Sequence, residues 1–149
     1  MRAKQKTAFV GHGFALEDKP VVDSVLDTLQ RAGISVMTGE PPEARGISKQ
    51  IQERISTSDI FIAVMTRRHW IQDKKTWTTS AWVVEEKGYS LGQNPERPVI
   101  VLVEAGISIP TDTGGLDGDL EKIVFDSAQF SIAEAKLEEM VRQLVAKTE

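Results

Sequence analysis

Short apolar runs alternate with amphipathic segments along this chain, and that pattern is typical of a parallel sheet covered by helices. Five runs predict strands. The third and fourth are apolar almost throughout, which indicates strands covered on both faces. The five predicted strands are Thr7–Val10, Ser35–Thr38, Ile60–Met65, Pro98–Val103 and Lys122–Phe125.

Apolar residues at intervals of three or four predict helices between these strands. We expect the first helix to begin at Asp18, as its N-cap, and to stop at Gly33, where a left-handed backbone is favoured. A second helix is expected from the spacing of Ile47, Ile51 and Ile55.

A third helix is expected from about Ser80 to Leu91, and a fourth closes the chain. The fourth opens with Ser131-Ile132-Ala133-Glu134, a capping box. In the third, small and apolar residues fall on one narrow face, which we expect to pack against the sheet. These residues are Ala81, Val84, Gly88 and Leu91.

This succession of elements predicts an α/β fold, a flavodoxin-like, doubly wound, five-stranded parallel sheet of order 2-1-3-4-5 with helices on both faces. In such sheets ligands bind outside the carboxyl ends of the strands. The loops of interest are therefore Gly11–Asp18, Gly39–Gly46 and Thr66–Ser80.

Composition narrows the function classes. The 149 residues suit one domain, residues 1–149, and the polar end Lys147–Glu149 suits a boundary within a longer protein. The chain has no cysteine, so disulfides and thiolate metal sites are excluded. Its net charge of −4, with scattered basic residues, disfavours nucleic acid as a partner. No apolar run is long enough to span a bilayer, and we expect a cytoplasmic domain.

The segment from Ser80 to Glu86 carries the strongest candidate chemistry. Trp82 and Glu86 are four residues apart, so a helix stacks them on one face. An aromatic plane beside a carboxylate suits a nucleotide, because the carboxylate can stabilise positive charge on a sugar as its glycosidic bond breaks. Glu85 competes for this role, but the four-residue spacing favours Glu86. On spacing alone, a core Trp and a solvated Glu pair are the more common arrangement.

Segment by segment, the whole chain resembles a TIR domain. Phe9–Gly13 with Asp18 resembles the family's first strand and the acidic residue after it, and Gly39–Gly46 resembles its BB loop. Ser58-Asp59 before the third strand is similar to the family's Ser-Asp. Ser80, Trp82 and Glu86 match its Ser-x-Trp-x-x-x-Glu pattern.

The resemblance implies an NAD glycohydrolase or cyclase of an immune or anti-phage system, with NAD as substrate, no cofactor and Glu86 as the catalytic glutamate. It also implies self-association through the Glu40–Arg45 loop. His12 and Glu40 depart from common family residues, which leaves the contacts to the purine side open. Expected substrate contacts are Trp82, Gly11, His12, Gly13, Phe14, Glu40, Thr66, Arg67 and Ser80.

Several alternatives stay open. A non-enzymatic TIR adaptor would act by assembly alone, although adaptors tend to lack the glutamate found at Glu86. A dinucleotide-binding dehydrogenase module is a further alternative, because Gly11-x-Gly13 matches the first two glycines of the Gly-x-Gly-x-x-Gly motif. Leu16 stands at the position of the third glycine, which argues against it. Arg67 and Arg68 either bind a pyrophosphate or form a solvated pair. The only two histidines, at positions 12 and 69, make a weak case for a metal, and we expect none.

Overall fold

A computed structural model describes residues 5–39, 47–107 and 121–147. Five parallel strands form one sheet in the order β2-β1-β3-β6-β7. Because β4 and β5 form a separate hairpin, this is the order 2-1-3-4-5 predicted from the sequence, and the flavodoxin-like α/β class is confirmed. The strands are β1 Thr7–Gly11, β2 Ser35–Thr38, β3 Ile60–Met65, β6 Val99–Glu104 and β7 Glu121–Phe125.

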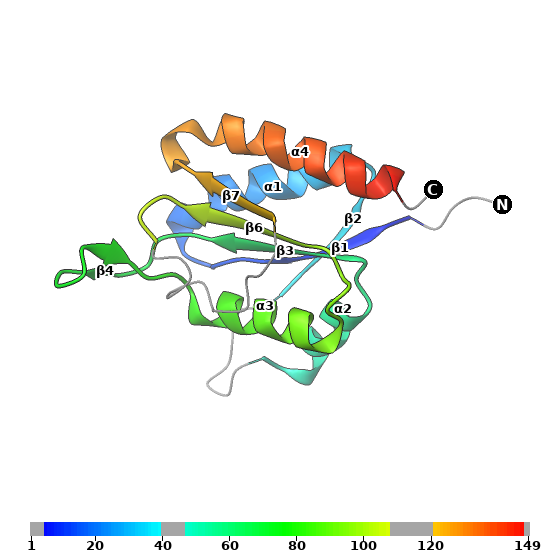
Figure 1. Ribbon diagram of the computed structural model, residues 1–149, viewed down its shortest axis with the longest axis horizontal. Coiled ribbons are helices and arrows are strands. Elements are labelled where there is room, and N and C mark those ends of the chain that lie inside the picture. Colours follow the sequence, from blue (N-terminus) through cyan, green and yellow to red (C-terminus); the bar gives the residue numbers. More distant parts are fainter. Residues whose placement is uncertain (1–4, 40–46, 108–120, 148–149) are drawn as a thin grey trace.

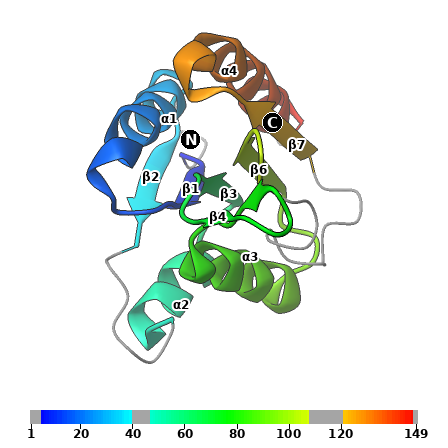
Figure 2. The same ribbon diagram turned by 90° about the vertical axis from the view of Figure 1, so that its left-hand side faces the viewer.

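Two helices cover each face of the sheet (Figure 1). One face carries α1, Lys19–Arg31, and α4, Phe130–Ala146. The other face carries α2, Lys49–Ser56, and α3, Ala81–Gln93. Figure 2 looks onto the edge of the sheet where the parallel strands end, with the two helical layers above and below it. Among the described residues, no helix is long and apolar enough to cross a membrane.

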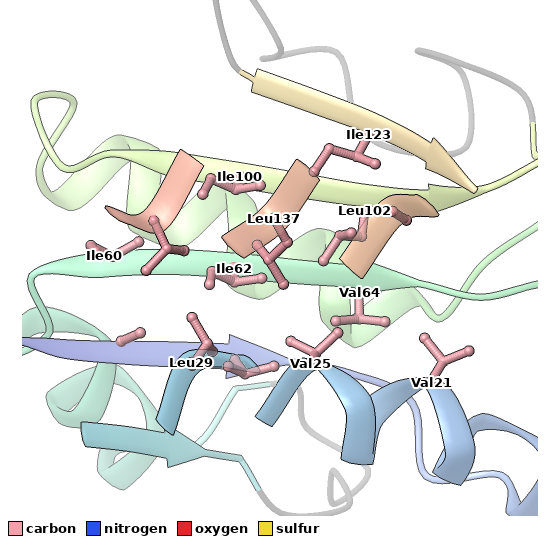
Figure 3. Close-up of a cluster of buried hydrophobic side chains, with 14 of the residues drawn as sticks. Val21, Val25, Leu29, Ile60, Ile62, Val64, Ile100, Leu102, Ile123 and Leu137 are labelled. Atoms are coloured by element: carbon pink, nitrogen blue, oxygen red, sulfur yellow. The ribbon is translucent and has the colours of Figure 1, made fainter. Parts of the chain in front are cut away.

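The layer between the sheet and the α1–α4 pair is made of aliphatic side chains (Figure 3). Val25 and Leu29 of α1 and Leu137 of α4 have no exposed surface. They pack on the aliphatic side chains of the central strands, such as Ile62. Burying a side chain of this size contributes about 1.5–3 kcal/mol, so this layer supplies much of the stability.

A small hairpin lies between β3 and α3, where the sequence predicted only a polar loop. Its strands are β4, Trp70–Ile71, and β5, Thr76–Trp77, and they pair antiparallel. The two indole rings lie 5.6 Å apart. The Trp77 backbone N–H donates to the Gly106 carbonyl at 2.9 Å. In Figure 1 the hairpin extends beyond the strand ends of the sheet.

The fourth helix begins earlier than its predicted capping box. A 3-10 turn, Ser127–Gln129, leads into α4, and the Asp126 carboxylate accepts a hydrogen bond from the Ala128 N–H. The chain is already helical at Phe130, so Ser131 lies inside the helix and does not cap it.

Candidate active site

The face of α3 that packs on the sheet is only partly the one predicted, since Val84 and Leu91 do pack against the apolar cluster on this side. The expected residues, Ala81, Val84, Gly88 and Leu91, are half-buried or exposed. The buried face consists of Val83, Glu86, Lys87 and Ser90. Two ionisable residues therefore occupy buried positions on α3, and one of them is Glu86.

The Glu86 carboxylate lies at the ends of β1 and β2. A Cβ on Gly11, the last residue of β1, would stand 3.0 Å from its Oε1. A Cβ on Gly39, directly after β2, would stand 3.1 Å from its Oε2. Only glycine leaves normal room for the carboxylate at these two places. The strand ends are thus shaped around Glu86.

Burial changes the acidity of this group. Glu86 is 5% exposed. Desolvation, and secondarily the negative charge of Glu85, raises the pKa of Glu86 to about 8. Glu85 itself is exposed. No hydrogen bond or ion pair links the Glu86 carboxylate to another residue in the described part of the chain. This is the pattern expected of a functional carboxyl group.

Three aromatic rings meet where the first turn of α3 faces the loop after β1. The half-buried Trp82 donates its Nε1–H to the His12 carbonyl at 3.2 Å, which ties α3 to the loop after β1. The Phe14 and Trp82 rings are stacked, with centroids 6.3 Å apart. The His12 ring lies 4.8 Å from Phe14. Together these rings form an aromatic wall, defined here as His12, Phe14 and Trp82, and Trp82 lies one helical turn before Glu86 on α3.

A buried ion pair holds the loop that carries this wall. The Arg68 guanidinium bonds to both carboxylate oxygens of Asp18, and Asp18 also accepts from the Ala15 N–H at 3.2 Å. Asp18 precedes α1, yet its side chain does not cap that helix as the sequence predicted. A Cβ on Gly13 would overlap the Arg68 guanidinium. Glycine is therefore required where the pair crosses the loop.

The match of the sequence to a family model identifies the family. The pattern of the TIR domain of CAP12/Pycsar effector proteins matches residues 7–118, most of the chain, including Glu86 and Trp82. The chain belongs to this family. It is a TIR domain of the kind found in bacterial anti-phage effectors. No curated protein matches the sequence significantly.

Solved structures similar to this TIR domain share its fold at low sequence identity. A flavodoxin-like domain from Synechococcus sp. is 10% identical with a TM-score of 0.58, covering 95% of this chain and 99% of its own. A CMP N-glycosidase from Clostridium botulinum is 16% identical with a TM-score of 0.57, covering 89% and 99%. A 2-deoxyribosyltransferase from Bacillus psychrosaccharolyticus is 17% identical with a TM-score of 0.52, covering 88% and 95%. These similarities show the fold.

Not all expected contact residues of the TIR domain gather at Glu86. Thr66 and Arg67 line a separate hollow of about 270 Å³, together with Asp18, Arg68 and Trp77. Arg67 donates to the Ala105 carbonyl at 2.7 Å, and its guanidinium lies 5.5 Å from the centre of the Trp77 ring. Both arginines after β3 are thus bonded within the fold, Arg68 half-buried and Arg67 exposed.

The remaining expected residues are placed as follows. Ser80 is the N-cap residue of α3. Its buried hydroxyl has no hydrogen-bond partner among the described residues, and neither has the buried hydroxyl of Thr66. His69 is exposed. Glu40 and the rest of Glu40–Arg45 lie outside the described residues. Gly39 and the Asp18–Arg68 pair were not predicted as site residues, although a glycine ending a strand is a sign of close approach.

Proposed function

We propose that this TIR domain cleaves NAD at the bond between nicotinamide and ribose, with Glu86 as the catalytic residue. One observation carries the proposal. A buried carboxyl group without a described polar partner lies at the strand ends where ligands of this fold bind, one helical turn from Trp82 of the aromatic wall. Such a group destabilises the fold, so its presence there calls for a chemical role.

The reaction places positive charge where a carboxylate can stabilise it. As the C1′–N1 bond breaks, its electron pair stays on the nicotinamide nitrogen and neutralises the ring. The positive charge moves to the ribose, which becomes oxocarbenium-like. The Glu86 carboxylate stabilises this cation, and Trp82 offers a flat apolar surface to a ring. Water then attacks C1′ and loses a proton, giving ADP-ribose; attack by another nucleophile gives a cyclic or exchanged product.

The protonation state of Glu86 gives this chemistry a pH dependence. With its pKa raised to about 8, the group is mostly neutral near pH 7 in the absence of substrate. The ionised form is the one that stabilises the ribose cation, and the positive nicotinamide ring favours it. We therefore expect kcat/KM to rise about tenfold per pH unit below pH 8 and to level off above it.

Two observations support the assignment. The family match covers Ser80, Trp82 and Glu86, which the resemblance to NAD-cleaving TIR domains rests on. Two similar structures are described as a CMP N-glycosidase and a 2-deoxyribosyltransferase. The fold is therefore compatible with reactions at the glycosidic bond of nucleosides. In an anti-phage effector, loss of NAD or production of a signalling nucleotide would be the output.

The test is incubation of the protein with NAD, followed by chromatography of the products. We expect nicotinamide with ADP-ribose or a cyclic product. Glu86→Gln should lower the rate by about 100- to 1000-fold, because it removes the charge that stabilises the cation. Glu85→Gln is the matched control and should cost little, since Glu85 is exposed. An intact NAD pool at every protein concentration would favour the non-enzymatic adaptor instead.

We further propose that the domain is cytoplasmic and self-associates through Glu40–Arg45, with a head-to-tail contact that extends into open strands. The reason for expecting self-association is the composition of the site. The described residues around Glu86 provide few polar groups to enclose a dinucleotide. Turnover per molecule should then rise with protein concentration in a dilution series followed by light scattering. Constant turnover in a monomeric sample would contradict this part of the proposal.

A further inference from the structure

A second hollow, here called the α1 hollow, lies on the other side of the β1 and β2 ends from α3. It measures about 300 Å³. Its walls include apolar side chains from the loop after β1 and from α1. Thr38, the last residue of β2, also lines it. The apolar lining residues used below are Phe14, Leu16, Val22 and Leu26.

The α1 hollow adjoins the candidate active site through two backbone connections. Thr38 lines the hollow, and the next residue, Gly39, leaves space for Oε2 of Glu86. His12 also lines the hollow, and the residue before it, Gly11, leaves space for Oε1. Glu86 and the hollow therefore lie on opposite sides of the same two strand ends, with only backbone between them at the glycines.

Phe14 connects the two places through its ring. It stacks with Trp82 in the aromatic wall and also lines the α1 hollow, and it is 37% exposed. Leu16, at the opening, is 83% exposed. Apolar side chains left this open at the mouth of a hollow are typical of a surface that a ligand covers.

Val22 shows that the hollow is not simply part of the core. It is 6% exposed, yet among the described residues it belongs to neither of the two apolar clusters that pack on the sheet. Its neighbour Val21 does belong to one of them. The Val22 side chain is thus buried against the hollow.

The size and chemistry of the hollow suit one flat ring system. Ligand sites commonly measure about 300–1,000 Å³, so this one lies at the small end and would hold part of a dinucleotide. Its apolar walls match the faces of a purine. Lys19 and Asp23, paired at 2.8 Å, also line it and offer a cation and an acceptor. In open α/β sheets of this kind, ligands bind outside the carboxyl ends of the strands.

We propose that the α1 hollow binds the adenine half of NAD, so that the dinucleotide crosses the ends of β1 and β2 with its nicotinamide ribose at Glu86. This inference rests on the proposed function for the position of the other half. It assigns Phe14, Val22 and Leu26 as the residues that select the base.

Binding of AMP tests the hollow without any catalysis. In a titration followed by NMR, AMP should shift the amide signals of residues 12–16 and 22–26 in the wild-type domain. Val22→Phe fills the hollow and should weaken binding at least tenfold. Leu16→Ala, at an exposed position that the fold tolerates, should weaken it severalfold. Ser127→Phe adds the same ring at the Thr66–Arg67 hollow and is the matched control, with unchanged AMP affinity.

Kinetics with two substrates separate this inference from the proposed function. Nicotinamide mononucleotide lacks the adenosine half. Val22→Phe should therefore raise the KM for NAD at least tenfold and leave cleavage of the mononucleotide as in wild type. If AMP binds as expected but NAD is never cleaved, the hollow stands and the proposed function fails. If AMP does not bind, or if Val22→Phe leaves its affinity unchanged, the inference is overturned.

Discussion

Two charged residues in and after α3 are buried to the same extent, but one is surrounded by hydrogen-bond partners and the other is not. Arg97, which follows the helix, is 5% exposed, as is Glu86 in its middle. The Arg97 guanidinium donates to the Ser58 and Ser56 carbonyls at 3.0 and 3.3 Å and to Gln93 Oε1 at 2.6 Å. It also donates to the carbonyl and hydroxyl oxygens of Ser90 at 3.3 and 3.0 Å.

Glu86 has no comparable set of partners among the described residues. A buried charge is tolerated where hydrogen bonds replace water, which is the case for Arg97. The Arg97 end of α3 is therefore built for stability, since it ties the helix to the loop between α2 and β3. The middle of α3 buries the Glu86 carboxyl group without described hydrogen bonds that would stabilise its ionised form. The difference indicates where the chain gives up stability for chemistry.

The largest effect is expected at Arg97. Arg97→Met keeps length and apolar contact but leaves several buried acceptors without donors, so we expect a loss of about 3–5 kcal/mol in the free energy of unfolding. Urea unfolding measures it. Arg142→Met is the control, because Arg142 is exposed and its described partner is Glu138 on the same helix; it should change stability by less than about 1 kcal/mol. Equal losses in both variants would refute the contrast.

Gly13→Ala tests the ion pair on the carboxyl side of the sheet. The new Cβ would overlap the Arg68 guanidinium and stand 2.5 Å from Oδ2 of Asp18, so we expect a loss of about 1–3 kcal/mol. A second variant, Arg68→Ala, removes the overlap with the guanidinium and frees the Asp18 side chain to move away from the new Cβ. The double variant should therefore be more stable than the sum of the single effects predicts. If the stability losses of the two single variants simply add in the double variant, the ion pair does not restrict the residue at position 13.

Trp82 distinguishes packing from substrate contact. The ring is half-buried against the α2–α3 side of the core, so Trp82→Ala should lower stability by about 1–3 kcal/mol and NAD cleavage by at least tenfold. Trp82→Phe keeps a ring and loses only the Nε1 bond to His12, about 1 kcal/mol. Thermal melts and initial rates of both variants provide the comparison. Wild-type cleavage by a folded Trp82→Ala variant would remove Trp82 from the site.

The sheet could be predicted from the sequence because its strands follow simple rules. Ile60–Met65 and the run before Glu104 are buried on both faces, and their uniform apolar character makes them conspicuous. Gly33 ends α1 with a φ of +82°, as its sequence position indicated. Local patterns were sufficient at these places.

The orientation of α3 could not be predicted in this way. Periodicity assigns apolar residues to the buried face, whereas this helix buries Glu86, Lys87 and Ser90 instead. The hairpin escaped prediction because its strands have two residues each, too short for alternation to appear. The Arg68–Asp18 pair joins residues 50 apart in sequence, and no local signal reveals such a contact. The prediction failed mainly where buried polar groups replace apolar ones.

Our central claim is that the fold keeps Glu86 buried at a loss of stability. Its pKa is raised in the folded state, to about 8, so the neutral form is favoured there. Stability from this group is therefore fully present below the unfolded pKa of about 4.5 and is lost as the pH rises through 8. Because Gln cannot ionise, the Glu86→Gln variant does not lose this stability as the pH rises.

The most direct measurement is the melting temperature of wild type and Glu86→Gln from pH 4.5 to pH 9. We predict nearly equal values at pH 4.5 and a more stable Gln variant at pH 8, by a free energy on the order of 2–4 kcal/mol. Glu85→Gln should show no such divergence, because Glu85 is exposed. A Glu86→Gln variant that melts at or below wild type at pH 8 would contradict the account, since the fold would then stabilise the ionised carboxylate.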